Sequence, residues 1–141
     1  MRVDRDTIAA IATSSGVGGI AIVRLSGNGA ESILKALFVP AGRRDSFASH
    51  ELMYGRAVDE GGETLDEVMA VLMRAPRSYT KEDVAEIHCH GGGVSANAVL
   101  RRALSLGARM AQPGEFTKRA FLNGRIDLSR AEAVMRLISR S

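Results

Sequence analysis

The sequence predicts an α+β domain in which helices pack on a mixed or antiparallel sheet. Two observations indicate this class. Short runs rich in β-branched residues alternate with segments of helical periodicity, and Gly-rich turns separate them in the order ββα-ββ-βα. The chain has 141 residues and is 45% hydrophobic, which suits a single domain with one core. A short strand and two helical segments complete the plan.

The first part of the chain predicts two strands and a helix. Strands are expected over residues 7–13 and 20–25, joined by the Gly-rich loop 14–19. Asn28 and Glu31 have the spacing of a capping box, and a helix is expected to follow and to end near Pro40. Its apolar residues recur at helical spacing: Ala30, Ile33, Leu34, Leu37 and Phe38.

The middle of the chain predicts a hairpin and a further strand. Residues 41–50 show no period, so we expect a mobile loop there. Residues 52–58 and 65–73 flank a Glu-Gly-Gly turn and read as the two arms of a hairpin. After a connector over 75–79, residues 84–90 read as a strand that Gly91, Gly92 and Gly93 close.

The last third predicts three helices and a short strand. Apolar residues indicate a helix that ends at Gly107: Ala96, Val99, Leu100, Ala103 and Leu104. A strand is expected over 109–111, and two helical segments flank the Asn123-Gly124 turn. In the second segment Ser129 and Glu132 form a capping box, followed by an apolar stripe: Ala133, Val134, Leu137 and Ile138.

This last helix has no obvious place to bury its stripe, so we expect it to begin a second unit. The predicted division is a first domain over residues 5–125 and the start of a truncated helical domain over 126–141. The chain is therefore expected to be part of a longer protein.

Composition excludes several classes of protein. No apolar run reaches the roughly 18 residues of a membrane span, so a membrane protein is not expected. The single cysteine, Cys89, has no partner for an internal disulfide, which suits a cytoplasmic location. Residues 101–141 hold nine Lys or Arg and three Asp or Glu. This basic segment could bind an anion, or it could form a solvent-exposed face without a ligand. An aromatic content of 4% offers no stacking platform for single-stranded RNA.

Neither of two Gly-rich nucleotide-binding patterns indicates a nucleotide site in this chain. Residues 16–21 satisfy G-x-G-x-x-A, but a strand follows them rather than the helix that a pyrophosphate requires. The phosphate-binding pattern G-x-x-x-x-G-K-[ST] is absent from the sequence. Nucleotide hydrolysis by these residues is therefore not expected.

The strand over 84–90 places Glu86, His88 and His90 on one face. A metal site and a set of hydrogen-bonded structural side chains are the two interpretations, and the second is favoured because no further ligand cluster is evident. Cys89 alternates onto the other face and reads as a small buried hydrophobe rather than a nucleophile.

Glu86 has a sharper interpretation as a binding group. An ionised carboxylate accepts two parallel hydrogen bonds from an amidine-like edge such as the amino-pyrimidinone half of a pterin. The glutamate tail of a folate would call for cations such as Arg24 or Arg125. The alternative is an ion pair within the fold, and these residues alone leave both open.

Three motifs together identify a family resemblance. They are I-V-R-L-S-G at 22–27, E-D-V-A-E-I-H-C-H-G-G at 82–92 and P-G-E-F-T-K-R-A-F-L-N-G-R at 113–125, followed by I-D-L-S-R-A-E-A. The chain resembles the N-terminal domain of the MnmE/TrmE tRNA-modification GTPases from about residue 5 to its end. The resemblance implies a folate-binding fold like that of aminomethyltransferases, with contacts from Arg24, Glu86 and Arg125. Arg125 replaces the family's usual lysine, and residues 14–17 replace Pro-Pro-Gly and a basic residue.

The resemblance also implies a role and partners. The parent protein would form carboxymethylaminomethyl-type groups at C5 of the tRNA wobble uridine, together with the flavoprotein MnmG/GidA, and this domain would bind a reduced folate and form the homodimer. The folate would be the 5-formyl or methylene form of tetrahydrofolate. GTP, potassium and magnesium would bind only in the GTPase domain, which is absent here. This part of the protein should therefore bind folate without catalysing a reaction by itself. The alternatives are a dimerisation or RNA-docking module without a small ligand, or a fragment of an aminomethyltransferase-like enzyme.

Overall fold

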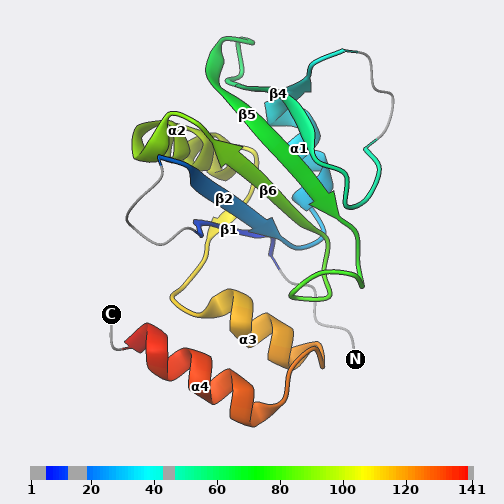
Figure 1. The fold of residues 1–141 in the computed structure, drawn as a ribbon, viewed down its shortest axis with the longest axis vertical. Helices are drawn as coiled ribbons and strands as arrows, with labels where there is room; N and C mark the ends of the chain where they lie inside the picture. The colour runs from blue at the N-terminus through cyan, green and yellow to red at the C-terminus, as the bar shows by residue number, and fades with distance from the viewer. Residues whose placement is uncertain (1–5, 13–18, 43–46, 140–141) are drawn as a thin grey trace.

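The computed structural model describes residues 6–12, 19–42 and 47–139, and they form a mixed sheet with helices on one face and at one end (Figure 1). The strands are β1 (Ile8–Ile11), β2 (Ala21–Ser26), β3 (Phe38–Pro40), β4 (Met53–Val58), β5 (Thr64–Met73), β6 (Val84–Cys89) and β7 (Arg109–Met110). The helices are α1 (Ala30–Leu37), α2 (Gly92–Ser105), α3 (Glu115–Leu122) and α4 (Leu128–Ser139). The predicted α+β class is confirmed.

The strand order is β3-β4-β5-β6-β2-β1-β7. All neighbours are antiparallel except β1 and β7, which run parallel. The predicted hairpin is confirmed as β4 and β5, with a register shift between Ala57 and Val58. Strand β6 lies in the centre between β5 and β2, so two segments distant in sequence meet there.

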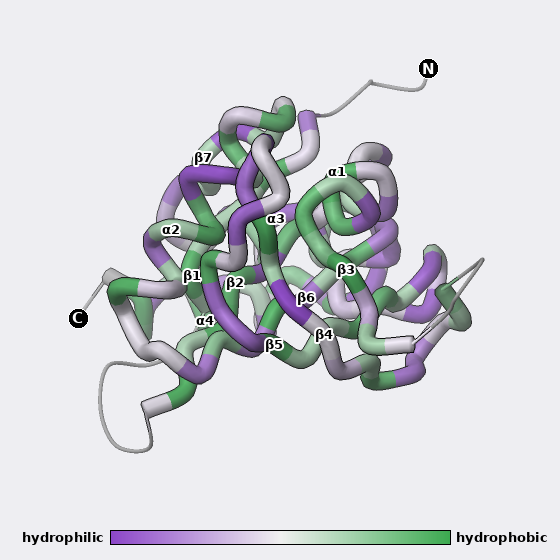
Figure 2. Tube along the Cα trace, turned by 90° about the horizontal axis from the view of Figure 1, so that it is seen from above, coloured by the Kyte–Doolittle hydropathy of each residue, from purple (hydrophilic) through white to green (hydrophobic). Residues whose placement is uncertain are grey.

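Helices α1 and α2 cover one face of the sheet (Figures 1 and 2). Their buried side chains are those expected from the helical period: Ala30, Ile33, Leu34 and Leu37 in α1, and Ala96, Val99, Leu100 and Ala103 in α2. They pack on the alternate residues of the central strands, such as Val23, Val68 and Ile87, which are fully buried. The core therefore lies between this face and the two helices.

Several predicted element boundaries are wrong. Phe38 leaves the first helix and starts β3, because its ring is buried edge-on against Phe47. Gly29 rather than Asn28 precedes α1, without a side-chain cap, and its N–H instead donates to Thr7 Oγ1 at 2.7 Å. Gly92 belongs to α2 instead of closing the strand before it.

The capping box expected at the last helix is also wrong. Ser129 lies inside α4, and Asp127 caps the helix by accepting a hydrogen bond from the Arg130 N–H at 2.8 Å. The expected apolar stripe differs in part, since Ala133 and Leu137 are exposed whereas Ala131 is buried.

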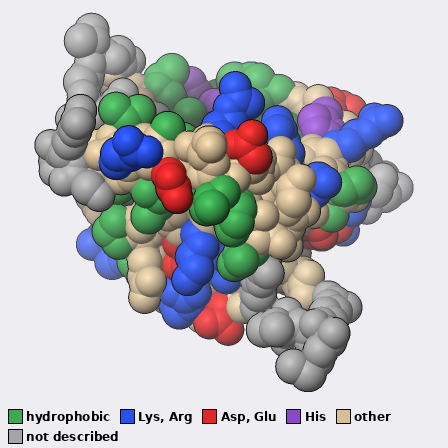
Figure 3. Space-filling view, turned by 90° about the horizontal axis from the view of Figure 1, so that it is seen from below, with side chains coloured by type: hydrophobic (Ala, Val, Ile, Leu, Met, Phe, Trp, Pro, Cys, Tyr) green, Lys and Arg blue, Asp and Glu red, His purple; other side chains and the backbone are tan. Residues whose placement is uncertain are grey.

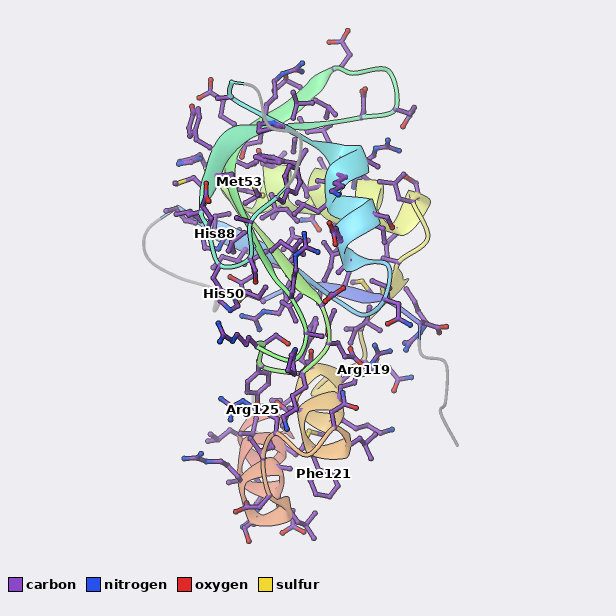
Figure 4. The ribbon with its side chains drawn as sticks, turned by 90° about the vertical axis from the view of Figure 1, so that its right-hand side faces the viewer. His50, Met53, His88, Arg119, Phe121 and Arg125 are labelled. Carbon is purple, nitrogen blue, oxygen red and sulfur yellow. The ribbon has the colours of Figure 1, made fainter. Side chains whose placement is uncertain are left out.

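Helices α3 and α4 lie at one end of the sheet, and a buried arginine attaches α3 to it (Figure 4). The Arg119 side chain is 5% exposed and its Nη1 lies 3.1 Å from Glu82 Oε1. The same carboxylate oxygen accepts a hydrogen bond from Ser26 Oγ at 2.8 Å, and Ser26 Oγ lies 2.7 Å from Thr80 Oγ1. This group, which we call the Arg119 network, joins α3, the end of β2 and the segment before β6.

The two ends of α3 are held separately. At its start, Arg109 pairs with Glu115 at 2.7 Å, and bonding to this guanidinium lowers the pKa of Glu115. At its end, Asn123 Nδ2 donates to the Thr80 carbonyl at 2.7 Å. The following turn uses Gly124 at φ +79°, which brings the Arg125 N–H back to the Ala120 carbonyl at 2.8 Å. The position of α3 is thus determined along its whole length.

Another ion pair links α1 to the sheet. The Arg74 guanidinium pairs with both carboxylate oxygens of Glu31, and Lys35 Nζ lies 2.9 Å from Oε2. Hydrogen bonding to Arg74, which has the larger effect, and to Lys35 lowers the pKa of Glu31 from its usual 4.5 to about 2.

We expect Arg119→Met to reduce the free energy of unfolding by about 3–5 kcal/mol, because it removes the cation that pairs with the partly buried Glu82 carboxylate. Lys118→Met, at the exposed neighbouring position, should change it by less than about 0.5 kcal/mol. Urea unfolding followed by circular dichroism measures both. Equal losses in the two variants would contradict the role of the Arg119 network.

Glu31→Gln should lower the thermal midpoint by about 2–4 °C at pH 7, as about 1 kcal/mol does in a domain of this size. Since the folded-state pKa is depressed, the stabilisation is present above pH 4.5 and is lost as the pH falls towards 2. Midpoints of the two proteins should therefore converge in acid. The exposed Glu63→Gln variant serves as the control, and a gap between Glu31→Gln and the unsubstituted protein that stays constant down to pH 2 would contradict the assignment.

Candidate functional site

An open cavity of about 930 Å³ lies where the sheet, α3 and α4 meet. The sheet contributes residues of β1, β2, β5 and β6, and the helical end contributes the segment before α3, its first turn and the end of α4. The lining residues are Ala10, Ile11, Ala12, Arg24, Met73, Tyr79, Val84, Glu86, Ala111, Gln112, Pro113, Gly114, Phe116, Thr117 and Ile138. Two of the three predicted binding residues, Arg24 and Glu86, are among them.

Arg24 and Glu86 form an ion pair on the sheet. They are direct neighbours in the antiparallel pairing of β2 and β6, and the period of two turns both side chains away from the α1–α2 face. Arg24 Nε donates to Glu86 Oε2 at 2.9 Å, and Arg24 Nη2 lies 2.9 Å from the same oxygen. The side chains are 30% and 16% exposed, so both remain accessible from the cavity.

His88 contacts the other oxygen of the same carboxylate. Its Nε2 lies 3.1 Å from Glu86 Oε1, whereas the His90 Nδ1 lies 2.9 Å from the Glu67 carbonyl, beyond the end of β6. The two histidines therefore have separate partners. Among the residues that the structure describes, no three His, Cys, Asp or Glu side chains are placed to hold a metal ion.

Aromatic side chains form the helical side of the cavity. The guanidinium carbon of Arg24 lies 5.7 Å from the centre of the Phe116 ring, within reach of a cation–π interaction. Tyr79 Oη lies 3.1 Å from Thr117 Oγ1, which joins the connector before β6 to α3. The cavity thus has a charged group on the sheet and flat apolar surfaces beside it.

Arg125 is not among the residues that line this cavity. It is exposed and lies after α3, at the connection to α4 (Figure 4). The structure therefore brings together Arg24 and Glu86 but not the third predicted residue. The departure over residues 14–17 lies outside the described part of the chain.

Cys89 is fully buried in the core, as the sequence predicted. Burial raises the pKa of its thiol to about 12, so the thiolate that a nucleophile requires is scarce at neutral pH.

Four of the nine basic residues of the segment 101–141 form ion pairs within the described part of the chain. Ion pairs join Arg102 to Glu60, Arg109 to Asp6 and Glu115, Arg119 to Glu82, and Arg136 to Glu132. Seen from below, the α3–α4 end shows basic, acidic and apolar side chains interspersed (Figure 3). A continuous cationic surface for a nucleic acid is not visible on this face.

Sequence reasoning missed several residues that build the site. Phe116 and Thr117 lie inside the P-G-E-F-T-K-R motif, which signalled their importance without assigning a role. No sequence pattern in the connector over 75–79 indicated that Tyr79 lies at a binding site. The long-range partners of the Arg119 network, Ser26 and Glu82, could not be paired from their spacing.

No helix in the described ranges has both the length and the apolar character needed to cross a membrane.

Comparison with known proteins identifies the family. Residues 7–125 match the family model of the GTP-binding protein TrmE N-terminus. A tRNA modification GTPase MnmE from Syntrophotalea carbinolica is 59% identical over 140 residues, which cover 99% of this chain and 31% of that protein. Proteins of the same name from Synechococcus sp. (strain JA-2-3B'a(2-13)) and Geobacillus kaustophilus are 57% and 59% identical over 136 residues, covering 30% and 29% of their lengths. The chain thus spans about three tenths of these relatives, and it belongs to the TrmE N-terminus family.

Proposed function

We propose that this chain binds a reduced folate in the cavity beside the Arg24–Glu86 pair, as the folate-binding and dimerisation module of a tRNA-modifying GTPase. The observation that carries the proposal is a partly exposed carboxylate at the wall of a cavity of about 930 Å³. This volume is within the range of about 300–1,000 Å³ that small-molecule sites occupy.

The chemistry of Glu86 suits the head of a folate. A carboxylate has about four acceptor positions. Arg24 Nε donates to Glu86 Oε2, Arg24 Nη2 lies 2.9 Å from the same oxygen, and His88 Nε2 contacts Oε1. An amino-pyrimidinone edge that pairs with both oxygens therefore has to share or displace one of these contacts. Displacement of Arg24 would leave its guanidinium beside the ligand, where it can bind a carbonyl or carboxylate oxygen.

The aromatic wall suits a flat ring. Phe116 and Tyr79 offer apolar surface next to the charged group, and small-molecule sites commonly combine such surfaces with a few polar contacts. Since Arg24 and Glu86 lie in contact with each other, both would contact the same end of an extended ligand. The likeness to aminomethyltransferase folate domains that the sequence implied is part of this proposal.

The role in the parent protein follows from the relatives, whose name is tRNA modification GTPase MnmE. We propose that the parent acts with the flavoprotein MnmG/GidA at C5 of the tRNA wobble uridine in the cytoplasm. A bound reduced folate would supply the one-carbon unit, carried at N5 or N10. The residues of this chain would orient the donor and exclude water from it.

We further propose that the chain forms a homodimer through the sheet face that α1 and α2 do not cover. One cross-strand row on this face consists of Tyr54, Met69, His88 and Ile22. Tyr54 is 50% exposed and the other three are partly exposed. Such an apolar row on an open sheet is typical of a surface that a second copy covers.

Glu86→Gln should weaken the binding of 5-formyltetrahydrofolate about 10- to 150-fold, the loss expected for hydrogen bonds to a charged group. Titration calorimetry on the 141-residue chain measures the affinity. Arg24→Lys should weaken it too, because lysine lacks the planar fork of arginine.

Matched controls lie on the same sheet face. Glu67 and Arg56 are also a cross-strand pair, of β5 and β4, and neither lines the cavity. Glu67→Gln and Arg56→Lys should bind as the unsubstituted chain does. Absence of folate binding by the unsubstituted chain, with tRNA binding that falls steeply with salt, would favour a docking module instead.

Sedimentation equilibrium should give twice the mass of one chain, and Met69→Lys should shift the population towards monomers by placing a charge within the apolar row. Val94→Lys, at an apolar position of α2 that is 84% exposed, should leave the mass unchanged. A monomeric unsubstituted chain at tens of micromolar would refute the dimer.

A further inference from the structure

Helix α4 lies outside the part of the chain that matches the family model, yet it reaches the cavity. The match ends at residue 125, whereas Ile138 near the end of α4 is among the lining residues. Ile138 is partly buried, so its side chain is held in place rather than projecting into solvent. The cavity therefore has a component that lies beyond the residues matched by the family model.

The attachment of α4 depends on a close approach to Gly114. Helix α4 packs mainly on α3. Gly114 precedes α3 with φ +76°, and a Cβ atom at this position would overlap Met135 Sδ, lie 2.7 Å from Met135 Cε and lie 3.5 Å from Ile138 Cδ1. Absence of a side chain at Gly114 thus lets Met135 and Ile138 seat against the start of α3. Gly114 itself also lines the cavity.

The spacing along α4 agrees with this contact. Ala131, Met135 and Ile138 occupy positions i, i+4 and i+7, which share one face of a helix. Ala131 is buried and Met135 is 38% exposed, whereas Leu137 on the opposite face of the helix is 67% exposed. One face of α4 therefore turns towards α3 and the cavity.

We propose that α4 forms one wall of the ligand site, in which Ile138 contacts the bound ligand and the Gly114–Met135 contact sets the position of that wall. This inference rests on the proposed function for the identity of the ligand. The wall is apolar and the Arg24–Glu86 pair is charged, so the site suits a ligand with one hydrogen-bonding edge and an apolar face. Ligand binding and the docking of α4 on α3 are then linked, because the ligand gains contacts with α4 only when α4 is docked.

The first experiment measures the affinity for 5-formyltetrahydrofolate by calorimetry on the full chain. Gly114→Ala should weaken it about threefold, because the added methyl group overlaps Met135 Sδ and forces that side chain away from the start of α3. Gly62→Ala is the matched control, since Gly62 has a similar φ of +84° in the β4–β5 turn but open space around it. The double variant Gly114→Ala/Met135→Ala should regain part of the affinity, and Ile138→Ala should weaken it about threefold to tenfold.

The second experiment measures, without any ligand, how well α4 is docked against the cavity. In an Ile138→Cys chain, the new thiol should react slowly with a maleimide while α4 is docked. Adding Gly114→Ala should raise its labelling rate at least about fivefold, whereas adding Gly62→Ala should not. Cys89 contributes little background, because burial raises its thiol pKa to about 12.

The outcomes separate this inference from the proposed function. Loss of folate affinity in Glu86→Gln with unchanged affinity in both Gly114→Ala and Ile138→Ala overturns the wall and leaves the folate site standing. Absence of folate binding by the unsubstituted chain overturns the folate site. In that case the labelling rates still decide whether Gly114 seats α4, and equal rates in the two glycine variants overturn the wall as well.

Discussion

The ion pair of Arg119 and Glu82 determines where the helical end of the molecule lies. A guanidinium that is 5% exposed and a carboxylate that is 15% exposed are tolerable in a fold only when they satisfy each other. Ser26 and Thr80 complete the hydrogen bonds around them. Because these groups come from β2, the segment before β6 and α3, the pair can form only when α3 docks at one end of the sheet. Any other position of α3 would separate the Arg119 guanidinium from the Glu82 carboxylate.

The cavity is a consequence of this docking. With α3 in place, Phe116 and Thr117 face the strands that carry Arg24 and Glu86, and α4 follows on the outer side of α3. The sheet thus supplies the Arg24–Glu86 pair together with apolar residues such as Ile11, and α3 adds the Phe116 ring. Arg24 connects the two halves, since it pairs with Glu86 and lies over the Phe116 ring. The site is therefore sensitive to the position of the helices as well as to its own polar residues.

Much of the fold could be predicted because burial leaves a local trace in the sequence. The 3.6-residue period identified the buried faces of α1 and α2, and the two-residue period placed Glu86 and Cys89 on opposite faces of β6. One error falls where a distant contact overrides a local pattern, and another where two local caps compete. Phe38 continues the apolar period of α1 but pairs with Phe47 instead. Asp127 caps α4 although Ser129 and Glu132 have the better capping spacing.

The sequence by itself determined the α+β class, the strands and helices that build it, and the face of its strand on which Glu86 lies. Tertiary structure alone decided that these two side chains are direct neighbours, that Phe116 and Tyr79 join them, and that Arg125 stays outside the cavity. The reason is physical. Periodicity reports which side of an element is buried, whereas strand register and helix docking depend on contacts such as that of Arg119 with Glu82, whose partners lie 37 residues apart.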